Sequence, residues 1–190
     1  NDTMRIGYLG PDGTYAQQAT EELVKKLKLS DVEKLPLKSI DDVLESLNRG
    51  EIDSAVVPLK NNLAGDYTET VLGLQRYNFD RADSIDLQIK LAFGIHSDAN
   101  ETAVGEIQSK DTALRECSVY LRKHYPDAQL VEVESTAKAM QNIAQQNLRH
   151  VAAVGSEIGM KLYGLKILHD NIGDQQDNYT TFLYLRRILN

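Results

Sequence analysis

The sequence is poor in cysteine. Cys117 is the only cysteine among the 190 residues, which excludes a disulfide framework within the chain. A chain without disulfides suits a reducing compartment, and we therefore expect a cytoplasmic location. Cys117 shares a helical apolar stripe with Leu114 and Leu121, a pattern that favours a core thiol over a nucleophile.

Long hydrophobic runs are also missing. No uncharged apolar stretch is long enough to span a bilayer, and the chain does not open with a signal-peptide pattern. Positive charge is scarce too, because 21 Lys and Arg stand against 28 Asp and Glu and give a net charge of −7. Nucleic acids and anionic membranes attract proteins with a basic face. We expect neither as a partner.

The sequence lacks the motifs of nucleotide-binding and metal-binding proteins. The pair Gly10 and Gly13 has neither the third glycine nor the downstream acidic residue of a dinucleotide fingerprint, and no Walker motif occurs. The four histidines are scattered, with no two at metal-ligand spacing. One His- and Asp-rich segment is better interpreted as a solvated acidic loop than as a metal site; it contains His169, Asp170, Asp174 and Asp177. We expect no cofactor and no metal.

What the chain has is a regular alternation of strand and helix patterns. Strands are expected at 4–9, 33–37, 54–57 (ending before Pro58), 85–96, around 107, 130–134, 151–154 and 179–187. Helices are expected at 15–27, 40–47, from about 66–68, and at 113–123, 136–145 and 157–163. Such alternation predicts an α/β fold of mixed, mainly parallel sheets with right-handed crossovers.

The two halves of the chain follow the same scheme, which favours two lobes over one large sheet. We expect residues 4–80 and 175–190 to form lobe 1, and residues 81–174 to form lobe 2. The long strand at 85–96 is the natural crossing segment, and 179–187 is its return. No linker is rich in proline or serine, so the lobes are expected to pack together.

One element recurs in both halves: a serine-capped helix that leads through a short turn into a buried apolar strand. In the first half it consists of Ser39, Val43, Leu44, Leu47 and the strand 55–57, and in the second of Ser135, Ala139, Met140, Ile143 and the strand 152–154. Helix–turn–strand units are common, so coincidence explains the echo as well as an internal repeat does.

Three strand-to-helix junctions are candidates for binding an anion. In open α/β sheets, ligands collect at the carboxyl ends of strands, where helix N-termini present unpaired N–H groups. The junctions are 10–15, 58–65 and 134–137, and each carries hydroxyls, amides or glycines. Each alone is more simply explained by capping and turn formation, but three together favour a site for a small carboxylate.

These junctions together resemble the catalytic domain of the prephenate dehydratase family over nearly the whole chain. Residues 7–15 (GYLGPDGTY) resemble its opening motif, and 57–65 (VPLKNNLAG), continuing to Glu69 and Thr70, resemble its P-[IV]-E-N-S-x-x-G motif. The matches continue in order with Ser109, Ala113, Leu114 and Cys117 for S-H-P-x-A-L-x-x-C, with 135–137 and 163–165, and with 178–182 (NYTTF) for N-x-T-R-F.

The resemblance implies a two-lobed fold like that of type II periplasmic-binding proteins, with a ligand cleft between the lobes. It implies a lyase that converts prephenate to phenylpyruvate in phenylalanine biosynthesis, with loss of carbon dioxide and hydroxide and without a cofactor. It assigns proton donation to Thr180, since a hydroxyl aimed at the leaving oxygen is the expected machinery. The implied substrate-binding residues are Thr14, Tyr15, Lys60, Asn61, Asn62, Ser135, Thr136, Asn178, Thr181 and Phe182.

Several positions depart from the family motifs. The arginine of T-R-F is Thr181, and the glutamate and serine of E-N-S are Lys60 and Asn62. An arginine fork holds a carboxylate in a bidentate way that threonine does not reproduce. Lys60 and Lys110 add positive charge at motif positions, and one of them is a candidate replacement. For Lys110 a solvent-facing role is the simpler interpretation.

Two classes of function follow. The first is prephenate dehydratase, with a decarboxylating lyase as a close variant that the retention of Thr180 disfavours. The second is a non-catalytic or altered-specificity binding protein for a small carboxylate, which the departures at 60, 62 and 181 favour. The family resemblance also implies a homodimer. Many family members continue into a regulatory ACT domain that binds phenylalanine, whereas this sequence stops at Asn190, so we expect no ACT domain in this polypeptide and no feedback by phenylalanine.

Overall fold

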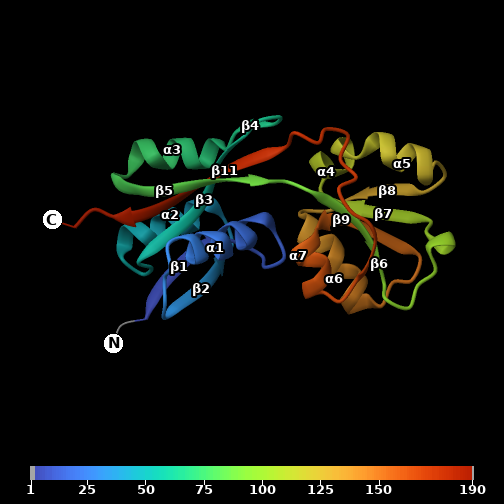
Figure 1. The fold of residues 1–190 in the computed structure, drawn as a ribbon, viewed down its shortest axis with the longest axis horizontal. Coiled ribbons are helices and arrows are strands. Elements are labelled where there is room, and N and C mark those ends of the chain that lie inside the picture. Colours follow the sequence, from blue (N-terminus) through green and yellow to red (C-terminus); the bar gives the residue numbers. More distant parts are fainter. Residues whose placement is uncertain (1–2, 190) are drawn as a thin grey trace. The chain divides into compact units, whose positions relative to one another are not determined.

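The computed structural model describes residues 3–189, which form two units, each built around one mixed sheet (Figure 1). The first unit runs as far as Gln88 and resumes at Asn178, and the second spans Ile89–Asp177. The expected boundaries, after residue 80 and before residue 175, differ because Gln88 still pairs with Tyr179 in the first sheet.

The first unit alternates strands and helices and then receives the C-terminal strand. Its elements are β1 (Met4–Leu9), α1 (Tyr15–Lys26), β2 (Val32–Leu37), α2 (Ile40–Arg49), β3 (Ser54–Asn61), β4 (Gly65–Asp66), α3 (Thr68–Arg76), β5 (Phe79–Gln88) and β11 (Tyr179–Arg187). The strand order is β2-β1-β3-β11-β5, with β4 attached to β3. The predicted parallel pairing holds for β2, β1 and β3, whereas β11 is antiparallel to β3 and β5.

Helices α2 and α3 pack on one face of this sheet, and α1 covers the other (Figure 1). The α2 face buries alternate residues of β3 and β11, among them Ala55, Val57, Leu183 and Leu185. Because side chains alternate along a strand, the intervening residues of β11 point to the α1 face. Helix α2 begins as predicted at Ser39, whose hydroxyl accepts a hydrogen bond from the Asp42 N–H at 3.0 Å.

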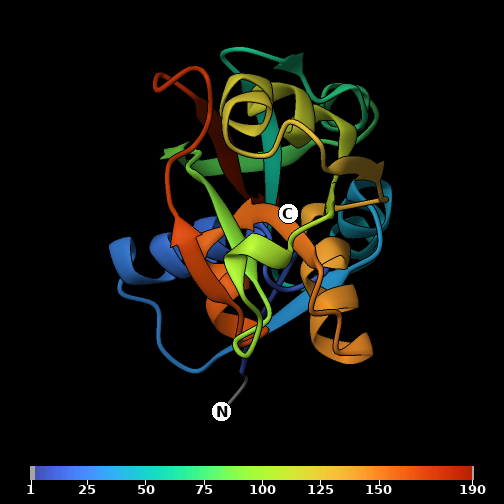
Figure 2. The ribbon, with the colours of Figure 1, turned by 90° about the vertical axis from the view of Figure 1, so that its right-hand side faces the viewer.

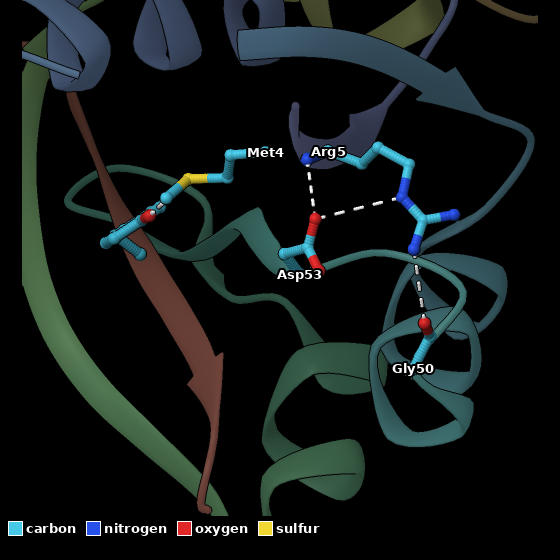
Figure 3. A network of polar contacts seen from close by, with 5 residues as sticks. Met4, Arg5, Gly50 and Asp53 are labelled. Atoms are coloured by element: carbon cyan, nitrogen blue, oxygen red, sulfur yellow. Dashed lines mark hydrogen bonds and ion pairs between the residues drawn. The ribbon is translucent and has the colours of Figure 1, made fainter. Parts of the chain in front are cut away.

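A polar network holds the amino-terminal edge of the first sheet (Figure 3). The backbone N–H of Arg5 donates to the Asp53 carboxylate at 2.8 Å, and its guanidinium donates to the Gly50 carbonyl at 3.4 Å. Gly50 ends α2 in the left-handed conformation, with φ of 77°. These contacts join β1 to the turn between α2 and β3. The candidate site lies at the opposite, carboxyl edge of the sheet.

The second unit repeats the plan with other strand partners. Its elements are β6 (Leu91–Ile95), η1 (Glu101–Ala103), β7 (Glu106–Ser109), α4 (Asp111–Glu116), α5 (Ser118–His124), β8 (Gln129–Glu132), α6 (Thr136–Gln146), β9 (Val151–Ser156), α7 (Glu157–Leu162) and β10 (Lys166–His169). The strand order is β10-β6-β9-β7-β8. Helices α6 and α7 lie on one face and α4 and α5 on the other (Figure 2).

The serine-capped helix of the second half is also confirmed. The Ser135 hydroxyl accepts from the Lys138 N–H at 2.9 Å, and α6 ends at Asn147 in the left-handed conformation, as α2 does at Gly50. Each of these helices leads to a buried central strand, β3 or β9. The two units therefore share this serine-capped helix–turn–strand arrangement, which internal repetition and coincidence explain equally well.

Four sequence expectations need correction. The segment 85–96 is two strands, because β5 pairs with β11 and β6 pairs with β9 and β10 in the other sheet. Strand β3 continues through Pro58 to Asn61, because β11 pairs with it from Arg186 opposite Ser54 to Thr180 opposite Asn61. The helix 113–123 is broken at Cys117, and β4 and β10 were not expected.

The break at Cys117 has a visible cause in Asp174. The Asp174 carboxylate accepts from the Val119 N–H and from the Ser118 hydroxyl, both at 3.1 Å, and the Asp174 N–H donates to the Glu116 carbonyl at 2.7 Å. Asp174 thereby caps a new helix, α5. No helix within residues 3–189 is both long enough and apolar enough to cross a membrane.

Candidate functional site

The candidate residues of the first unit lie along one edge of its sheet. Strands β1 and β3 are parallel, so their carboxyl ends meet at this edge, and antiparallel β11 begins there. The loop 10–15 follows β1, Asn61 ends β3, and the register of the two strands sets Asn61 directly opposite Thr180. Residues 119 positions apart in the chain are thus brought side by side.

Asn61 is the centre of a buried hydrogen-bond cluster. Its amide nitrogen donates to the Asn178 side-chain oxygen at 2.8 Å and to the Thr180 hydroxyl at 2.9 Å. Its amide oxygen accepts from the N–H groups of Leu63 and Ala64, both at 2.9 Å. Because the oxygen already accepts two backbone donors, the amide orientation is fixed and its nitrogen must face Thr180.

The hydroxyl of Thr180 is held with its proton available. Thr180 is 3% exposed, Asn178 4% and Asn61 8%. A hydroxyl has one donor and two acceptor positions, and Asn61 fills an acceptor position. No acceptor for the Thr180 proton occurs within residues 3–189. The arrangement is that of a preorganised donor whose proton has no acceptor among the described residues.

Asn62 connects the same two strands through the backbone. Its side-chain oxygen accepts from the Tyr179 N–H at 2.7 Å, and its own N–H donates to the Tyr179 carbonyl at 3.0 Å. Tyr179 immediately precedes Thr180, so Asn62 fixes where β11 enters the sheet. The structure gives Asn62 this positioning contact, and its predicted role toward a ligand remains a prediction.

The start of α1 differs from the starts of α2 and α6, because the side chain at its N-cap position makes no capping hydrogen bond. Thr14 occupies the N-cap position, but its hydroxyl donates back to the Pro11 carbonyl at 2.9 Å. Gln17 instead accepts from the Gly13 N–H at 2.6 Å. The Thr14 side chain therefore does not cap α1, in contrast to Ser39 and Ser135 at the starts of α2 and α6.

A hydrogen bond from Tyr8 holds the loop before α1 in place. The Tyr8 hydroxyl donates to the Asp12 carboxylate at 2.5 Å. Burial, and then this hydrogen bond, raises the pKa of Tyr8 well above its ordinary value. Tyr8 therefore stays neutral and keeps donating to Asp12 over the whole physiological pH range.

Lys60 and Thr181 lie next to the buried cluster but face another way. Strand register pairs Lys60 with Thr181 across one side and with Asp66 across the other. The Thr181 hydroxyl donates to the Asp86 carboxylate of β5 at 2.6 Å. Thr181 shares a face of β11 with Leu183, on the α2 side, whereas Thr180 points to the α1 side. A bulge between Thr181 and Phe182 adds one residue to β3 here.

Lys60 is the cation nearest in register to position 181. It is exposed, and it makes no ion pair with another residue between 3 and 189. Phe182, by contrast, is buried to 3% exposure within the sheet. Phe182 therefore packs in the core, whereas Lys60 is exposed, and the predicted ligand contacts of both residues remain predictions.

Ser135 and Thr136 belong to the second unit. Ser135 caps α6 as described, and Thr136 is the first residue of that helix. Thr136 lies close to β9, since a Cβ added at Gly155 of that strand would approach the Thr136 Cβ to 3.2 Å. The structure confirms the capping role of Ser135, and the predicted ligand contacts of both residues remain predictions.

Two polar residues of this edge were not predicted. Gln17 had a signal, because Thr14-x-x-Gln17 has the spacing of a capping box. Asp86 had none, since its contact with Thr181 depends on the register of β5 and β11.

The structure also shows where the residues considered as metal ligands or as a nucleophile lie. Within residues 3–189, no three His, Cys, Asp or Glu side chains gather as a metal site. Cys117 is buried, and burial raises the pKa of its thiol to about 12. A surface hollow of ≈ 790 Å³ lies elsewhere in the first unit, between the loop at Gly10 to Asp12, the end of β2 and the solvent side of α2. It does not include the Asn61 cluster.

Comparison with known proteins gives these features a context. The family described as prephenate dehydratase matches residues 6–188. A bifunctional chorismate mutase/prephenate dehydratase of Aquifex aeolicus is 34% identical over 184 residues, which are 97% of this chain and 49% of that protein. Arogenate dehydratase/prephenate dehydratase 2 of Arabidopsis thaliana is 32% identical over 97% of this chain and 46% of that protein. The chain thus spans about half the length of the curated relatives it matches.

Solved structures give the fold. Prephenate dehydratase of Arthrobacter aurescens, in complex with L-Phe, matches 98% of this chain and 61% of that chain, with a TM-score of 0.88 and 23% identity. A periplasmic substrate-binding protein of Coxiella burnetii matches 97% of this chain and 84% of that chain, with a TM-score of 0.51 and 12% identity. The predicted α/β fold of periplasmic-binding type is confirmed. Because the family match extends over residues 6–188, the chain belongs to the prephenate dehydratase family.

Proposed function

We propose that this chain is a lyase that converts prephenate to phenylpyruvate, and that Thr180 is its catalytic donor. Membership of the prephenate dehydratase family supports the reaction class. The single observation that supports the residue is the hydrogen bond from Asn61 to the Thr180 hydroxyl at 2.9 Å, which leaves the Thr180 proton free to donate. Both residues occupy the motif positions of the resemblance.

The proposed reaction needs little from the protein besides positioning and a donor. The bond between the ring and its carboxylate breaks, carbon dioxide leaves, and the electron pair moves into the ring. The carbon–oxygen bond on the far side of the ring then breaks and hydroxide departs, which completes the aromatic ring. The Thr180 hydroxyl donates a hydrogen bond to this departing oxygen, where negative charge develops. Solvent then protonates the hydroxide to water, so no cofactor enters the balance.

The substrate side chain carries a second carboxylate, which must be held while the ring carboxylate leaves. The N-terminus of α1 carries the positive end of the helix dipole at the carboxyl edge of the sheet, which supports a role in holding an anion. Lys60 is a second candidate for this role, because strand register places it beside Thr181, where the family motif has arginine, at the edge of the sheet but on the face opposite Thr180. We propose that Lys60 supplies the cation that position 181 lacks. Its ammonium acts as a point charge and not as a bidentate fork.

The two alternative functions, decarboxylase and binding protein, differ from this proposal in which bonds of prephenate they leave intact. A decarboxylase releases carbon dioxide but retains the hydroxyl, and a binding protein does neither. Incubation with prephenate, followed by separate assays of carbon dioxide and of phenylpyruvate by its absorbance in alkali, distinguishes the three. Dehydration gives both products in equal amounts. Carbon dioxide without phenylpyruvate supports the decarboxylase, and thermal stabilisation by phenylpyruvate without turnover supports the binding protein.

Assembly is proposed from the family resemblance, and location from the lack of a disulfide framework in a chain with one cysteine. We propose a homodimer and a cytoplasmic location. Light scattering of the purified chain at micromolar concentration tests the first, since a monomer mass near the 21.3 kDa of the chain contradicts it.

A further inference from the structure

Two histidines of the second unit, distant in sequence, lie side by side on its surface. His124 ends α5 and His169 ends β10, and their ring centres are 6.0 Å apart with the planes inclined by 32°. Both rings pack on Tyr120, at 4.4 Å from His124 and 5.6 Å from His169. The spacing in the sequence gave no sign of this pair.

We infer that His124 and His169 bind a divalent transition-metal ion such as Zn²⁺. Imidazole nitrogen coordinates such ions at about 2.0–2.1 Å, so two rings on one tetrahedral ion have centres roughly 5 Å apart. The observed 6.0 Å is larger than this by an amount that small side-chain rotations remove. The proposal is independent of the function proposed for the first unit.

The ring nitrogens are available for coordination. Both histidines are exposed, and no hydrogen bond from another residue between 3 and 189 engages either ring. The Tyr120 hydroxyl is buried and makes no hydrogen bond to either ring or to any other group within residues 3–189. Neutral imidazole is the commonest metal ligand in proteins. Here only water competes with a metal ion for the ring nitrogens of His124 and His169.

The surrounding packing sets the two rings in place before a metal arrives. Tyr120 contacts Phe93 of β6 at 5.9 Å, and Phe93 stacks on Tyr125 at 4.7 Å. His169 pairs with Phe93 in the register of β10 and β6. Both histidines are thus attached to one aromatic cluster, which lowers the entropy lost when they share an ion.

Nearby charges and the ligand count set the strength of the site. Arg122 and Lys123 precede His124 and weaken cation binding, whereas Asp170 follows His169 and favours it. His124 also lies at the C-terminal end of α5, where partial negative charge favours a cation. No third protein ligand gathers within residues 3–189, so water completes the coordination. We expect an affinity in the micromolar range, well below that of a structural zinc site.

Calorimetric titration of the whole chain with ZnCl₂, in a buffer that does not chelate metals, tests the proposal. We expect one ion per chain, at least tenfold weaker binding in His124→Gln and in His169→Gln, and no change in His150→Gln. His150 is the matched control, because it is an exposed histidine of the same unit. A His124→Phe variant keeps a ring on Tyr120 and removes the coordinating nitrogen, so it separates coordination from packing.

Loss of zinc binding in His124→Phe, with an unchanged melting temperature in the absence of metal, supports the site. A wild-type affinity for zinc in His124→Phe, or in a variant that carries both His124→Gln and His169→Gln, overturns it. Absence of binding to the wild-type chain at millimolar ZnCl₂ overturns it as well.

Discussion

The side-chain amide of Asn61 donates to the hydroxyl of Thr180 at 2.9 Å, and the register of β3 and β11 sets the two residues directly opposite each other. The same amide is held by two backbone N–H groups of the following turn. A turn that joins β3 to β4 therefore determines how a hydroxyl on β11 is oriented. We consider this relationship the structural basis of the proposed activity.

The first prediction concerns Asn61 itself. Asn61→Ala removes four hydrogen bonds, of which the two to Asn178 and Thr180 are buried and the two from Leu63 and Ala64 are part-buried, so we expect a loss of about 2–3 kcal/mol in the free energy of unfolding. Asn61→Asp keeps the two acceptor contacts to Leu63 and Ala64 but removes both donors. We expect it to lose less stability and still lose most of the activity. Urea denaturation and phenylpyruvate formation measure the two effects, and equal activity of Asn61→Asp and wild type contradicts the assigned role.

The helix caps predict matched stability losses in the two units. Ser39→Ala and Ser135→Ala each remove an N-cap hydrogen bond, at 3.0 Å and 2.9 Å, and each is expected to cost about 1 kcal/mol. Ser46→Ala is the control, because Ser46 lies inside α2 and caps nothing. Its effect is expected to stay within about 0.5 kcal/mol. Chemical denaturation measures all three, and a Ser46→Ala loss as large as that of Ser39→Ala refutes the explanation by capping.

The buried thiol predicts a decline of stability in alkali. Burial raises the pKa of Cys117 to about 12, whereas an unfolded thiol titrates near about 8.5. Between these values the unfolded chain loses a proton that the native chain retains, so stability is fully present below about pH 8.5 and falls as the pH rises. The decline is expected to reach about 1 kcal/mol per pH unit and to be shallower in Cys117→Ala.

Thiol labelling checks the same assignment independently. With Ellman's reagent at pH 8, the native chain is expected to react far more slowly than the urea-unfolded chain. Rapid native labelling at the rate of a free thiol contradicts a buried Cys117.

Lys60 predicts a specific loss of anion binding. Lys60→Ala is expected to weaken phenylpyruvate binding roughly tenfold, as for a charge-assisted hydrogen bond, and the wild-type affinity is expected to fall with added salt. Lys110→Ala is the matched control, because Lys110 is the other lysine at a motif position and is exposed at the start of α4. Unchanged affinity in Lys60→Ala means that the missing arginine has no replacement at this position.

Local signals made much of this structure predictable. Ser39 and Ser135 precede apolar residues at helical spacing, and both cap helices as expected. The burial of Cys117 likewise follows from its place between Leu114 and Leu121. Each of these features depends on neighbours a few residues away, which a sequence pattern records directly.

The features that escaped prediction depend on distant parts of the chain. The alternation of apolar residues continues across Gln88 and Leu91, and only the choice of partner strands divides β5 from β6. The helix break at Cys117 comes from Asp174, more than fifty residues later. The contact of Thr181 with Asp86 likewise requires the register of two strands. Motif positions identified Asn61 and Thr180, but the direction of their hydrogen bond required the fold.

The central claim is that the Thr180 hydroxyl assists departure of the leaving oxygen. Phenylpyruvate formation from prephenate, compared in wild type, Thr180→Ser and Thr180→Ala, tests it most directly. A donor of this kind contributes about 10²–10⁴-fold to the rate, so Thr180→Ala is expected to lower kcat by about that factor with little change in KM. Thr180→Ser keeps the hydroxyl and is expected to retain a substantial part of the activity. Undiminished turnover in a folded Thr180→Ala would contradict the account.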